Sequence, residues 1–384
     1  MITKIKILRI INSLDPKYGG PSIATIDSTK ILNQNNFDVD IVTSDKKNSN
    51  FYKGRDIKII NLGPSIGKYS FNLKLFFWLL KNKHNYEKYI IHGLWQFNSL
   101  LARLILKKNY FIFTHGQLDP FFSFQKFKLF KKKIYWFLLE KKNLIKAESI
   151  LLTSENEKKN LKKTFVDTKG IKLNVINYGI LKSNFNKINS IKLFKKKFSI
   201  LRNETFFIYL GRFHKKKGCD ILIKSLKKVV DQNYKIKVLM AGPNNDYKKK
   251  LIKLSKKLKL ENNIIWSSLI LSELKCGAIA SSEAMLLASN GENFGVSIVE
   301  SLSFGKPVIT TNKVNIYEEI IKYKSGLICN NNVKSFSEAI IQYINLKKAL
   351  KRKMRLNAIN CFNECFNLKY NQVKLISILK KNNK

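Results

Sequence analysis

Short apolar runs alternate along this chain with amphipathic helical segments, and this alternation constrains the fold more than any other feature. The first repeat of the pattern has an apolar run at 4–12, the glycine turn "DPKYGGPS", a helical segment with Pro21 at its first position, and an apolar run at 38–44. Strands that alternate with helices in this way are typical of parallel sheets built from βαβ units. The sequence therefore predicts an α/β fold.

The pattern forms two series, separated by a polar and basic segment at 181–203 that has no clear period. Further predicted strands lie at 56–62, 88–93, 110–116, 149–154, 206–211, 235–242, 262–268, 283–289, 306–311 and 325–329. At 384 residues the chain fits two domains of ~150–200 residues each. We therefore expect a first domain at 1–185, a linker in the polar segment, a second domain at 200–355, and a C-terminal helix at 356–384 that packs back toward the first domain.

The charge of the chain is strongly positive, with 72 Lys and Arg residues against 26 Asp and Glu residues and a formal net charge of +46. The lysines are spread over almost the whole chain, and Lys, Asn and Ile are abundant together, as codon bias toward A and T would produce. No nucleic-acid module is recognisable, so we expect anionic small-molecule partners and no nucleic acid. A basic nucleic-acid-binding protein remains an alternative, which steep salt-dependent binding to arbitrary DNA would support.

The apolar runs and the cysteines indicate the compartment. No apolar run approaches the ~18 residues of a membrane helix, and the N-terminus has no signal-peptide cleavage pattern, so we expect a cytoplasmic protein. The five cysteines are scattered, which suits a reducing environment. Cys361 and Cys365 are four residues apart and are expected to be packed thiols, since no further ligands are spaced to complete a metal site.

Two loops that follow predicted strands carry the residues that favour a particular chemistry. After the strand at 206–211, Arg212 and Lys217 project from a loop and Gly218 opens an amphipathic helix. Two cations beside a helix N-terminus suit a diphosphate, because the helix dipole and free amides favour anions and Arg can bind two oxygens. The alternative is a solvated basic loop among many.

The second loop reads "GENFGVSIVE" and places two carboxylates around the start of a helix. Glu292 lies just before the helix N-terminus, where a phosphate or sugar oxygen could bind, and Glu300 lies two turns further on, where it could accept hydrogen bonds from a ribose diol. The alternative is that Glu292 caps the helix and Glu300 pairs with a lysine. The amides at the N-terminus of this helix belong to Phe294, Gly295 and Val296.

These loops resemble those of the retaining glycosyltransferases that use nucleotide-sugar donors. "NGENFGVSIVESLSFGKPVITT" is the most specific match and "GRFHKKKG" supports it, while "YGGPS" and "THGQLDP" fit a subgroup that makes bacterial surface polysaccharides. The resemblance extends nearly from end to end. It implies the GT-B fold, in which two Rossmann-like domains face each other across a cleft.

The resemblance also implies roles for individual residues. Arg212 and Lys217 would bind the donor diphosphate, Glu300 would hold the ribose, and Glu292 would contact the hydroxyls of the donor sugar. Backbone approach to sugar and phosphate would come from Gly20, Asn293, Phe294, Gly295 and Val296.

His115 closes the predicted strand at 110–116 and is the second candidate catalytic residue beside Glu292. In the enzymes that the chain resembles, a residue here touches the donor sugar or supports the reacting centre, although a lone histidine is often a hydrogen-bonded structural residue. His92 has a similar setting and a weaker claim.

The implied reaction is transfer of a sugar from a nucleoside diphosphate to an acceptor hydroxyl, with retention of configuration by front-side displacement. The acceptor would be a saccharide or a lipid-linked saccharide in the synthesis of lipopolysaccharide, capsule or exopolysaccharide. We expect no cofactor and no metal, because the cations and the helix dipole stabilise the leaving diphosphate. A sugar phosphorylase or an epimerase on the same scaffold is the alternative.

Two features leave further questions open. The chain departs from the family pattern at "NYGI", "LASNGE" and "WSSLI", which leaves the base of the donor undetermined. The segment 119–142 interleaves aromatic residues with lysine and, as a helix, would carry an apolar stripe beside positive charge. It could lie on an anionic membrane surface, or it could face the core of the domain.

Overall fold

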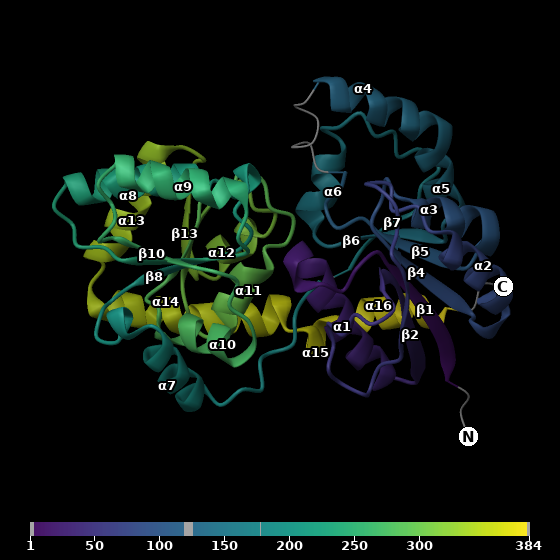
Figure 1. The fold of residues 1–384 in the computed structure, drawn as a ribbon, viewed down its shortest axis with the longest axis horizontal. Helices are drawn as coiled ribbons and strands as arrows, with labels where there is room; N and C mark the ends of the chain where they lie inside the picture. The colour runs from purple at the N-terminus through teal and green to yellow at the C-terminus, as the bar shows by residue number, and fades with distance from the viewer. Residues whose placement is uncertain (1–3, 119–125, 177, 382–384) are drawn as a thin grey trace. The chain divides into compact units, whose positions relative to one another are not determined.

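The computed structural model describes residues 4–118, 126–176 and 178–381. They form two compact units (Figure 1). The first unit comprises Met1–Tyr178 and Leu368–Lys384, and the second comprises Gly179–Asn367. The predicted architecture of two parallel-sheet α/β units is confirmed.

The first unit contains, in its described residues, a seven-stranded sheet in the order β3-β2-β1-β4-β5-β6-β7, in which all pairs are parallel. From β1 the chain adds β2 and β3 on one side and then β4 to β7 on the other side, so the strand order reverses between β1 and β4. The strands are β1 (Ile5–Ile11), β2 (Phe37–Lys46), β3 (Ile59–Gly63), β4 (Lys88–His92), β5 (Tyr110–Phe113), β6 (Ser149–Leu152) and β7 (Leu173–Val175).

Helices cover both faces of this sheet (Figure 1). One face packs a core of aliphatic and aromatic side chains that includes Leu8, Ile91 and Ile112 from the strands and Leu101 and Leu144 from the helices. The helices of this unit are α1 (Gly20–Asn33), α2 (Leu73–Asn82), α3 (Phe97–Leu101), α4 (Lys126–Tyr135), α5 (Lys141–Lys146), α6 (Glu155–Leu161), α15 (Leu368–Asn371) and α16 (Val373–Lys380).

The second unit contains, among the residues described, a six-stranded parallel sheet in the order β10-β9-β8-β11-β12-β13. Here the order reverses between β8 and β11. The strands are β8 (Phe207–Leu210), β9 (Val238–Ala241), β10 (Ile264–Ser267), β11 (Met285–Leu287), β12 (Val308–Thr311) and β13 (Gly326–Cys329).

Helices α8, α9 and α13 lie on one face of the second sheet, and α7, α10 and α14 lie on the other (Figure 1). Helix α8 has the apolar period that its sequence shows, and it buries Leu222, Ile223, Leu226 and Val229. The helices are α7 (Lys187–Lys197), α8 (Cys219–Asp231), α9 (Asp246–Lys257), α10 (Ser272–Ser281), α11 (Val296–Ser303), α12 (Tyr317–Lys322), α13 (Val333–Asn345) and α14 (Lys348–Cys361).

The predicted linker at 181–203 is wrong for most of its length. Helix α7 forms there and belongs to the second unit, where Phe194 is fully buried. Its partner is α10, which approaches so closely that a Cβ on Gly277 would lie 1.9 Å from the carbonyl oxygen of Ser190. The segment looked aperiodic because α7 buries only Ser190 and Phe194, which is too few residues for a recognisable stripe.

The end of the chain returns to the first unit at Leu368. Gln372 Nε2 donates a hydrogen bond to Ser28 Oγ on α1, and Lys88 Nζ donates to the carbonyl oxygen of Lys381 at 2.8 Å. Residues 356–367 belong to the second unit. One short strand, β7, has no counterpart among the predicted strands, since three residues at a sheet edge give little periodic signal.

No helix in the described ranges has both the length and the apolar character needed to cross a membrane.

We predict that Gly277→Ala will lower the free energy of unfolding of the second unit by about 1–3 kcal/mol, because the added methyl group cannot fit against the backbone of α7. The loss should outweigh the higher helix propensity of alanine, which is worth about 1 kcal/mol. Urea denaturation measures the change. Asn189→Ala, at an exposed position on α7, is the control and should change stability by less than about 0.5 kcal/mol. Equal stability of both variants would contradict the close packing of α7.

Candidate functional site

The predicted donor-binding loops lie next to each other at the switch point of the second sheet. Strands β8 and β11 are neighbours, and the order of the sheet reverses between them. The loop 211–218 follows β8, and the loop 288–295 follows β11. Ligands in open parallel sheets bind outside the carboxyl ends of the strands at such a point, because the connections there diverge to opposite faces and leave a crevice. The topology therefore brings together two segments that are about eighty residues apart.

Gly218 allows the two loops to touch. Its φ of 62° is left-handed, and a Cβ there would lie 1.7 Å from the carbonyl oxygen of Ala288. Any other residue would force the loops apart and would be strained as well. Before it, the ring of His214 accepts a hydrogen bond from the backbone N–H of Lys216 at 3.0 Å and caps the short turn η7 (Lys215–Lys217).

Further hydrogen bonds fasten the second loop to the first. The carbonyl oxygen of Lys216 accepts from the backbone N–H of Asn290 at 2.8 Å and from Ser289 Oγ at 2.9 Å. The carbonyl oxygen of Lys215 accepts from Asn290 Nδ2 at 2.6 Å. The backbone between the two predicted cations is thereby fixed in position, which preorganises the loop for a ligand.

Lys217 and Glu292 form an ion pair across the two loops, with both side chains less than one-fifth exposed. Burial acts to raise the pKa of Glu292, but the charge and hydrogen bond of Lys217, together with the charges of Lys216 and Arg212, outweigh it, so the pKa lies below its usual value. Because its pKa is lowered, Glu292 is ionised at neutral pH. Such a carboxylate contributes stability at pH values above its unfolded-state pKa, and this stability is lost as the pH falls through the folded-state pKa.

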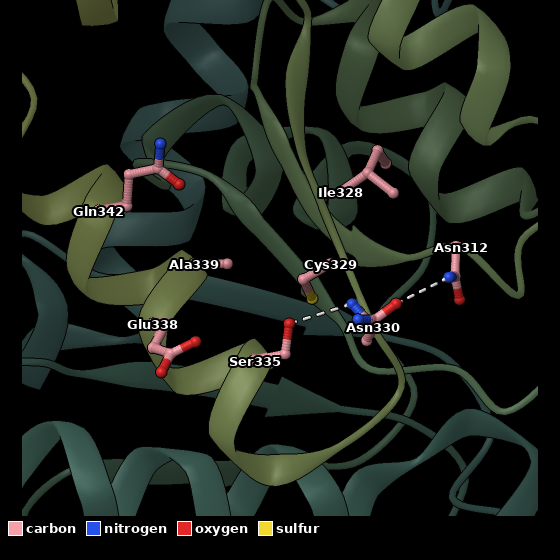
Figure 2. Close-up of a pocket in the computed structure, with 8 residues that line it drawn as sticks. All are labelled: Asn312, Ile328, Cys329, Asn330, Ser335, Glu338, Ala339 and Gln342. Atoms are coloured by element: carbon pink, nitrogen blue, oxygen red, sulfur yellow. Dashed lines mark hydrogen bonds between the residues drawn. The ribbon is translucent and has the colours of Figure 1, made fainter.

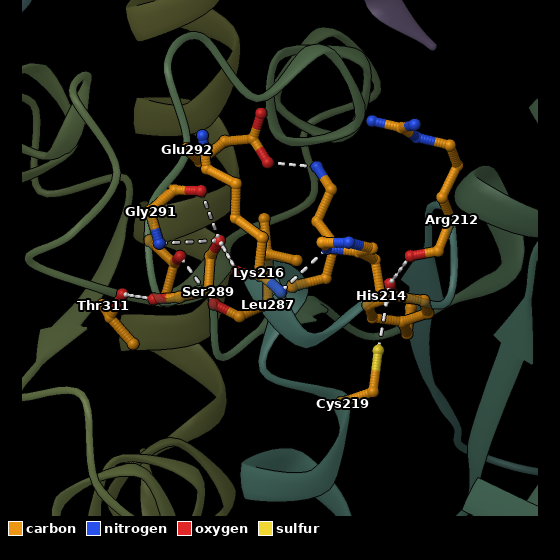
Figure 3. A network of polar contacts seen from close by, with 12 residues as sticks. Arg212, His214, Lys216, Cys219, Leu287, Ser289, Gly291, Glu292 and Thr311 are labelled. Carbon is orange, nitrogen blue, oxygen red and sulfur yellow. Dashed lines mark hydrogen bonds and ion pairs between the residues drawn. The ribbon is translucent and has the colours of Figure 1, made fainter. Parts of the chain in front are cut away.

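Arg212 lies on the same side of the site as this pair. Figure 3 shows its guanidinium and the Glu292 carboxylate extending in the same direction beyond the polar network beneath them. Tyr209 holds the backbone of Arg212 in place, since its hydroxyl donates to the carbonyl oxygen of Arg212 at 2.9 Å and accepts from Cys219 Sγ at 3.2 Å. Two cations and one carboxylate thus share one edge of the sheet.

The segment from Asn293 to Val296 forms the start of α11 at this edge. Gly295 is left-handed, with φ 72°, and is the N-cap of α11, which begins at Val296. Asn293 Oδ1 accepts from Asn315 Nδ2 at 3.2 Å, and the ring of Phe294 packs on Phe366 with centroids 5.8 Å apart. The N-terminus of the helix, with its partial positive charge, therefore lies directly after Glu292.

Glu300 pairs with a lysine, which is the alternative that the sequence left open. Its Oε1 accepts a hydrogen bond from Lys275 Nζ on α10, and both side chains are less than one-fifth exposed. Sequence reasoning missed Lys275, because no local pattern connects the two helices. A ribose that bound to Glu300 would meet a carboxylate already oriented by this lysine.

His115 and Gly20 belong to the first unit. His115 has a left-handed φ of 48°, which is unusual for a residue with a side chain. The buried carboxylate of Glu157 holds the backbone on both sides of it: Oε1 accepts from Thr114 Oγ1 and, at 3.0 Å, from the backbone N–H of Gly116. Oε2 accepts from the backbone N–H of Thr153 at 2.7 Å. Sequence reasoning missed Glu157.

Gly20 is the first residue of α1, after β1, at the switch point of the first sheet. The left-handed residue of this turn is its neighbour Gly19, with φ 101°. Asp119, which the sequence placed in the "THGQLDP" loop, lies outside the described residues.

A buried lysine contacts the "WSSLI" segment, one of the places where the sequence departs from the family pattern. Lys248 is mostly buried, and its ammonium donates to the carbonyl oxygen of Ser267 at 2.8 Å and to Asn244 Oδ1 at 2.8 Å. It also lies 5.4 Å from the centre of the Phe213 ring. Burial lowers the pKa of Lys248. One side chain therefore joins the loop after β9 to the end of β10.

A separate depression of about 460 Å³ lies at the ends of β12 and β13 (Figure 2). Asn312 and Asn330 are joined there by a hydrogen bond of 3.0 Å, and Ser335 Oγ accepts from the backbone N–H of Asn330 at 3.1 Å. None of the predicted site residues lines it. Within the described residues, no three His, Cys, Asp or Glu side chains are grouped as a metal site would require.

Comparison with known proteins agrees with this arrangement. The profile of the "Glycosyl transferases group 1" family matches residues 190–360. The capsular polysaccharide biosynthesis glycosyltransferase CapM of Staphylococcus aureus is 26% identical over 339 residues, which cover 82% of this chain and 83% of that protein. The alpha-1,3/1,6-mannosyltransferase ALG2 of Dictyostelium discoideum is 27% identical over 212 residues, 51% of this chain. The match spans about half of that relative, 48% of its length.

Among solved structures, Anabaena HepE in complex with UDP and glucose superposes with a TM-score of 0.78 at 17% identity, covering 98% of this chain and 99% of that one. At this identity the likeness shows the fold alone. It confirms the fold predicted from the sequence.

We predict that Glu157→Gln will destabilise the first unit by about 1–3 kcal/mol. Its amide nitrogen cannot accept a hydrogen bond, so whichever way the amide is turned, the backbone N–H of Gly116 or of Thr153 loses a partner. Urea denaturation followed by tryptophan fluorescence measures the loss. Glu155→Gln, exposed on the same helix, is the matched control. If the two variants unfold at the same urea concentration, Glu157 does not hold the His115 turn.

Proposed function

We propose that this chain, which belongs to the group 1 glycosyltransferases and has the GT-B fold, transfers a sugar from a nucleoside diphosphate to an acceptor hydroxyl with retained anomeric configuration. The observation that carries the proposal is the grouping of Arg212, Lys217 and Glu292 at the β8–β11 switch point. A diphosphate needs fixed cations, and a sugar needs hydrogen-bond acceptors beside them. These three residues provide both.

Lys217 and Glu292 neutralise each other when no ligand is bound, and the proposed donor changes that pairing. The diphosphate offers Lys217 and Arg212 a stronger anionic partner, while Glu292 stays ionised and accepts hydrogen bonds from sugar hydroxyls. Glu300 accepts from the ribose hydroxyls with Lys275 beside it. Backbone groups from Asn293 to Val296 lie around the sugar and the phosphate.

In the proposed reaction, the bond from the anomeric carbon to the diphosphate oxygen breaks as the bond to the acceptor oxygen forms on the same face of the sugar. The acceptor loses its proton to an oxygen of the departing diphosphate. The charge that develops on the diphosphate is stabilised by Arg212, Lys217 and the N-terminus of α11. Each preorganised group of this kind typically contributes a factor of ~10²–10³ to turnover.

We further propose that the product is a bacterial surface polysaccharide, made on a saccharide or lipid-linked saccharide acceptor. Support comes from CapM, whose name assigns that protein to capsular polysaccharide biosynthesis. A sugar phosphorylase or epimerase on the same fold is the alternative, and release of nucleoside diphosphate with transfer of the sugar distinguishes it. The HepE complex contains UDP, so UDP-sugars are the first donors to test.

A basic and apolar surface on the first unit supports contact with anionic lipid, where a lipid-linked acceptor would be found. Phe130, Ile134, Phe137 and Leu138 follow one helical face along α4 and η5 (Trp136–Glu140), and the exposed fractions of the two phenylalanines are 66% and 63%. Exposed lysines lie beside them. Such a surface binds the headgroup region of an anionic membrane through both apolar burial and charge. The part of the predicted stripe at 119–125 lies outside the described residues.

We predict that a nucleoside-diphosphate sugar will stabilise the wild-type protein, by about 2.7 kcal/mol at a hundredfold excess over its Kd, and that Lys217→Ala will remove this effect. Turnover should fall ~10²–10³-fold in the same variant. Thermal unfolding with UDP-, GDP- and ADP-sugars and an assay for released nucleoside diphosphate measure the two results. Lys224→Ala, at an exposed position on α8, is the control.

Glu292→Gln separates the role of the sugar contact from that of the diphosphate contact. The variant should keep its stabilisation by nucleoside diphosphate, because both cations remain, and should lose turnover. Near-normal turnover in both Lys217→Ala and Glu292→Gln would contradict the assignment of this site.

We also predict that the double variant Phe137→Ser, Leu138→Ser will bind vesicles of anionic lipid at least about tenfold more weakly than wild type at low salt. Each large apolar side chain contributes about 1.5–3 kcal/mol when fully buried. Flotation with and without anionic lipid measures the partition. Ile200→Ser removes an equally exposed residue, 63%, from the second unit and is the control. Vesicle binding that does not depend on lipid charge, or that is unchanged in the double variant, would contradict the proposed membrane contact.

A further inference from the structure

Two histidines meet at the carboxyl ends of neighbouring strands in the first unit. His92 is the last residue of β4, and His115 follows β5. His92 Nδ1 lies 2.9 Å from His115 Nε2, and the rings are stacked with centroids 5.2 Å apart. Only one of these two nitrogens can carry the shared proton when both rings are neutral, so the direction of this hydrogen bond fixes the tautomer of both.

The burial of His92 decides the direction. Its exposed fraction is 4%, and its Nε2 is buried without a hydrogen-bond partner in the described part of the chain. A buried N–H without an acceptor is rarer and more costly than a buried lone pair without a donor. The unpartnered Nε2 of His92 is therefore the unprotonated nitrogen, and its proton is on Nδ1. Thr25 Oγ1, 3.4 Å from Nδ1, is a weak second partner.

We propose that His92 is a positioning residue that donates its Nδ1–H to Nε2 of His115 and thereby holds His115 in the tautomer whose Nδ1–H is free to donate. His115 Nδ1 has no hydrogen-bond partner among the residues that the structure describes, and His115 is partly exposed where His92 is not. Under the proposed glycosyl transfer, on which this step rests, His115 is a hydrogen-bond donor to an oxygen of the sugar substrates. It does not act as the base.

Electrostatics around the pair support this assignment. Burial, together with the positive charge of Arg9, lowers the pKa of His115 to about 3. Burial, the neighbouring His115 and Arg9 lower the pKa of His92 well below its usual value. Arg9 is fully buried in β1, where its guanidinium donates to the carbonyl oxygen of Thr25 at 2.7 Å and to Ser28 Oγ at 2.7 Å. The Tyr178 ring, 6.0 Å from His115, completes the surroundings. At neutral pH both rings are therefore uncharged.

The consequence for the reaction concerns the proton of the acceptor. The one lone pair of neutral His115 is on Nε2 and is occupied by His92, so His115 has no site at which to accept that proton. The proton then goes to an oxygen of the departing diphosphate, as the front-side reaction requires. His115 contributes a donor that strengthens as negative charge develops on its oxygen partner.

Nitrogen-15 NMR of the histidine side chains tests the tautomer directly, without substrate. The chain has four histidines, and His84→Gln and His214→Gln leave only the pair to assign. We expect wild type to carry its protons on Nδ1 of both rings from about pH 5 to 8, with no titration. In His92→Leu the restraint is gone, and His115 should populate the Nε2–H form. His92→Asn places an amide donor where Nδ1 was and should restore the Nδ1–H form of His115.

Kinetics give the second readout. His92→Leu should lower kcat at least about tenfold with little change in the donor KM, and His92→Asn should recover most of the loss. Protonation of His115 at Nε2 in wild type, or a tautomer that is unchanged in His92→Leu, would overturn the proposal. If the protein turns over no nucleotide sugar, the proposed function fails while the NMR result still decides the tautomer. If His92→Leu does not fold, wild-type NMR alone decides it.

Discussion

The second unit depends on the contact between the backbone of Gly218 and the carbonyl oxygen of Ala288, which leaves no room for a Cβ. The contact brings the loop after β8 against the loop after β11, and the hydrogen bonds from Ser289 and Asn290 to the first loop follow from it. Lys217 and Glu292 can pair only because these backbones are so close. The charge arrangement on which the proposed donor site rests is therefore a consequence of backbone packing at a switch point of the sheet.

In a chain with 72 basic and 26 acidic residues, the carboxylates indicate sites with specific partners more clearly than the cations do. Most lysines lie on a solvated surface, where a single charge contributes little. The partly or fully buried acids have specific partners: Glu292 has Lys217, Glu300 has Lys275, and Glu157 has backbone and hydroxyl donors. Burying a charged or polar group is costly unless it is paired or hydrogen-bonded, so each of these acids marks a place where the fold provides specific partners.

The sequence predicted what depends on local pattern and missed what depends on packing between elements. The continuous apolar runs predicted most strands, and glycine turns marked the loops that carry Arg212 and Glu292. Lys275 and Glu157 were missed because each meets its partner through tertiary packing, with no spacing rule to reveal it. Helix α7 was read as a linker because it buries only Ser190 and Phe194, so its order comes from α10 and not from its own periodicity.

The two units solve the same structural problem with different chemistry. Each places polar groups near the carboxyl ends of strands at or beside its switch point: His92 at the end of β4 and His115 after β5 in one unit, and the loops after β8 and β11 in the other. The second unit gathers charges there, which suits a diphosphate. In the first unit, burial and the Arg9 cation keep His92 and His115 uncharged. In so basic a chain, the first unit therefore presents uncharged imidazole groups at the ends of its strands, where the second unit presents cations.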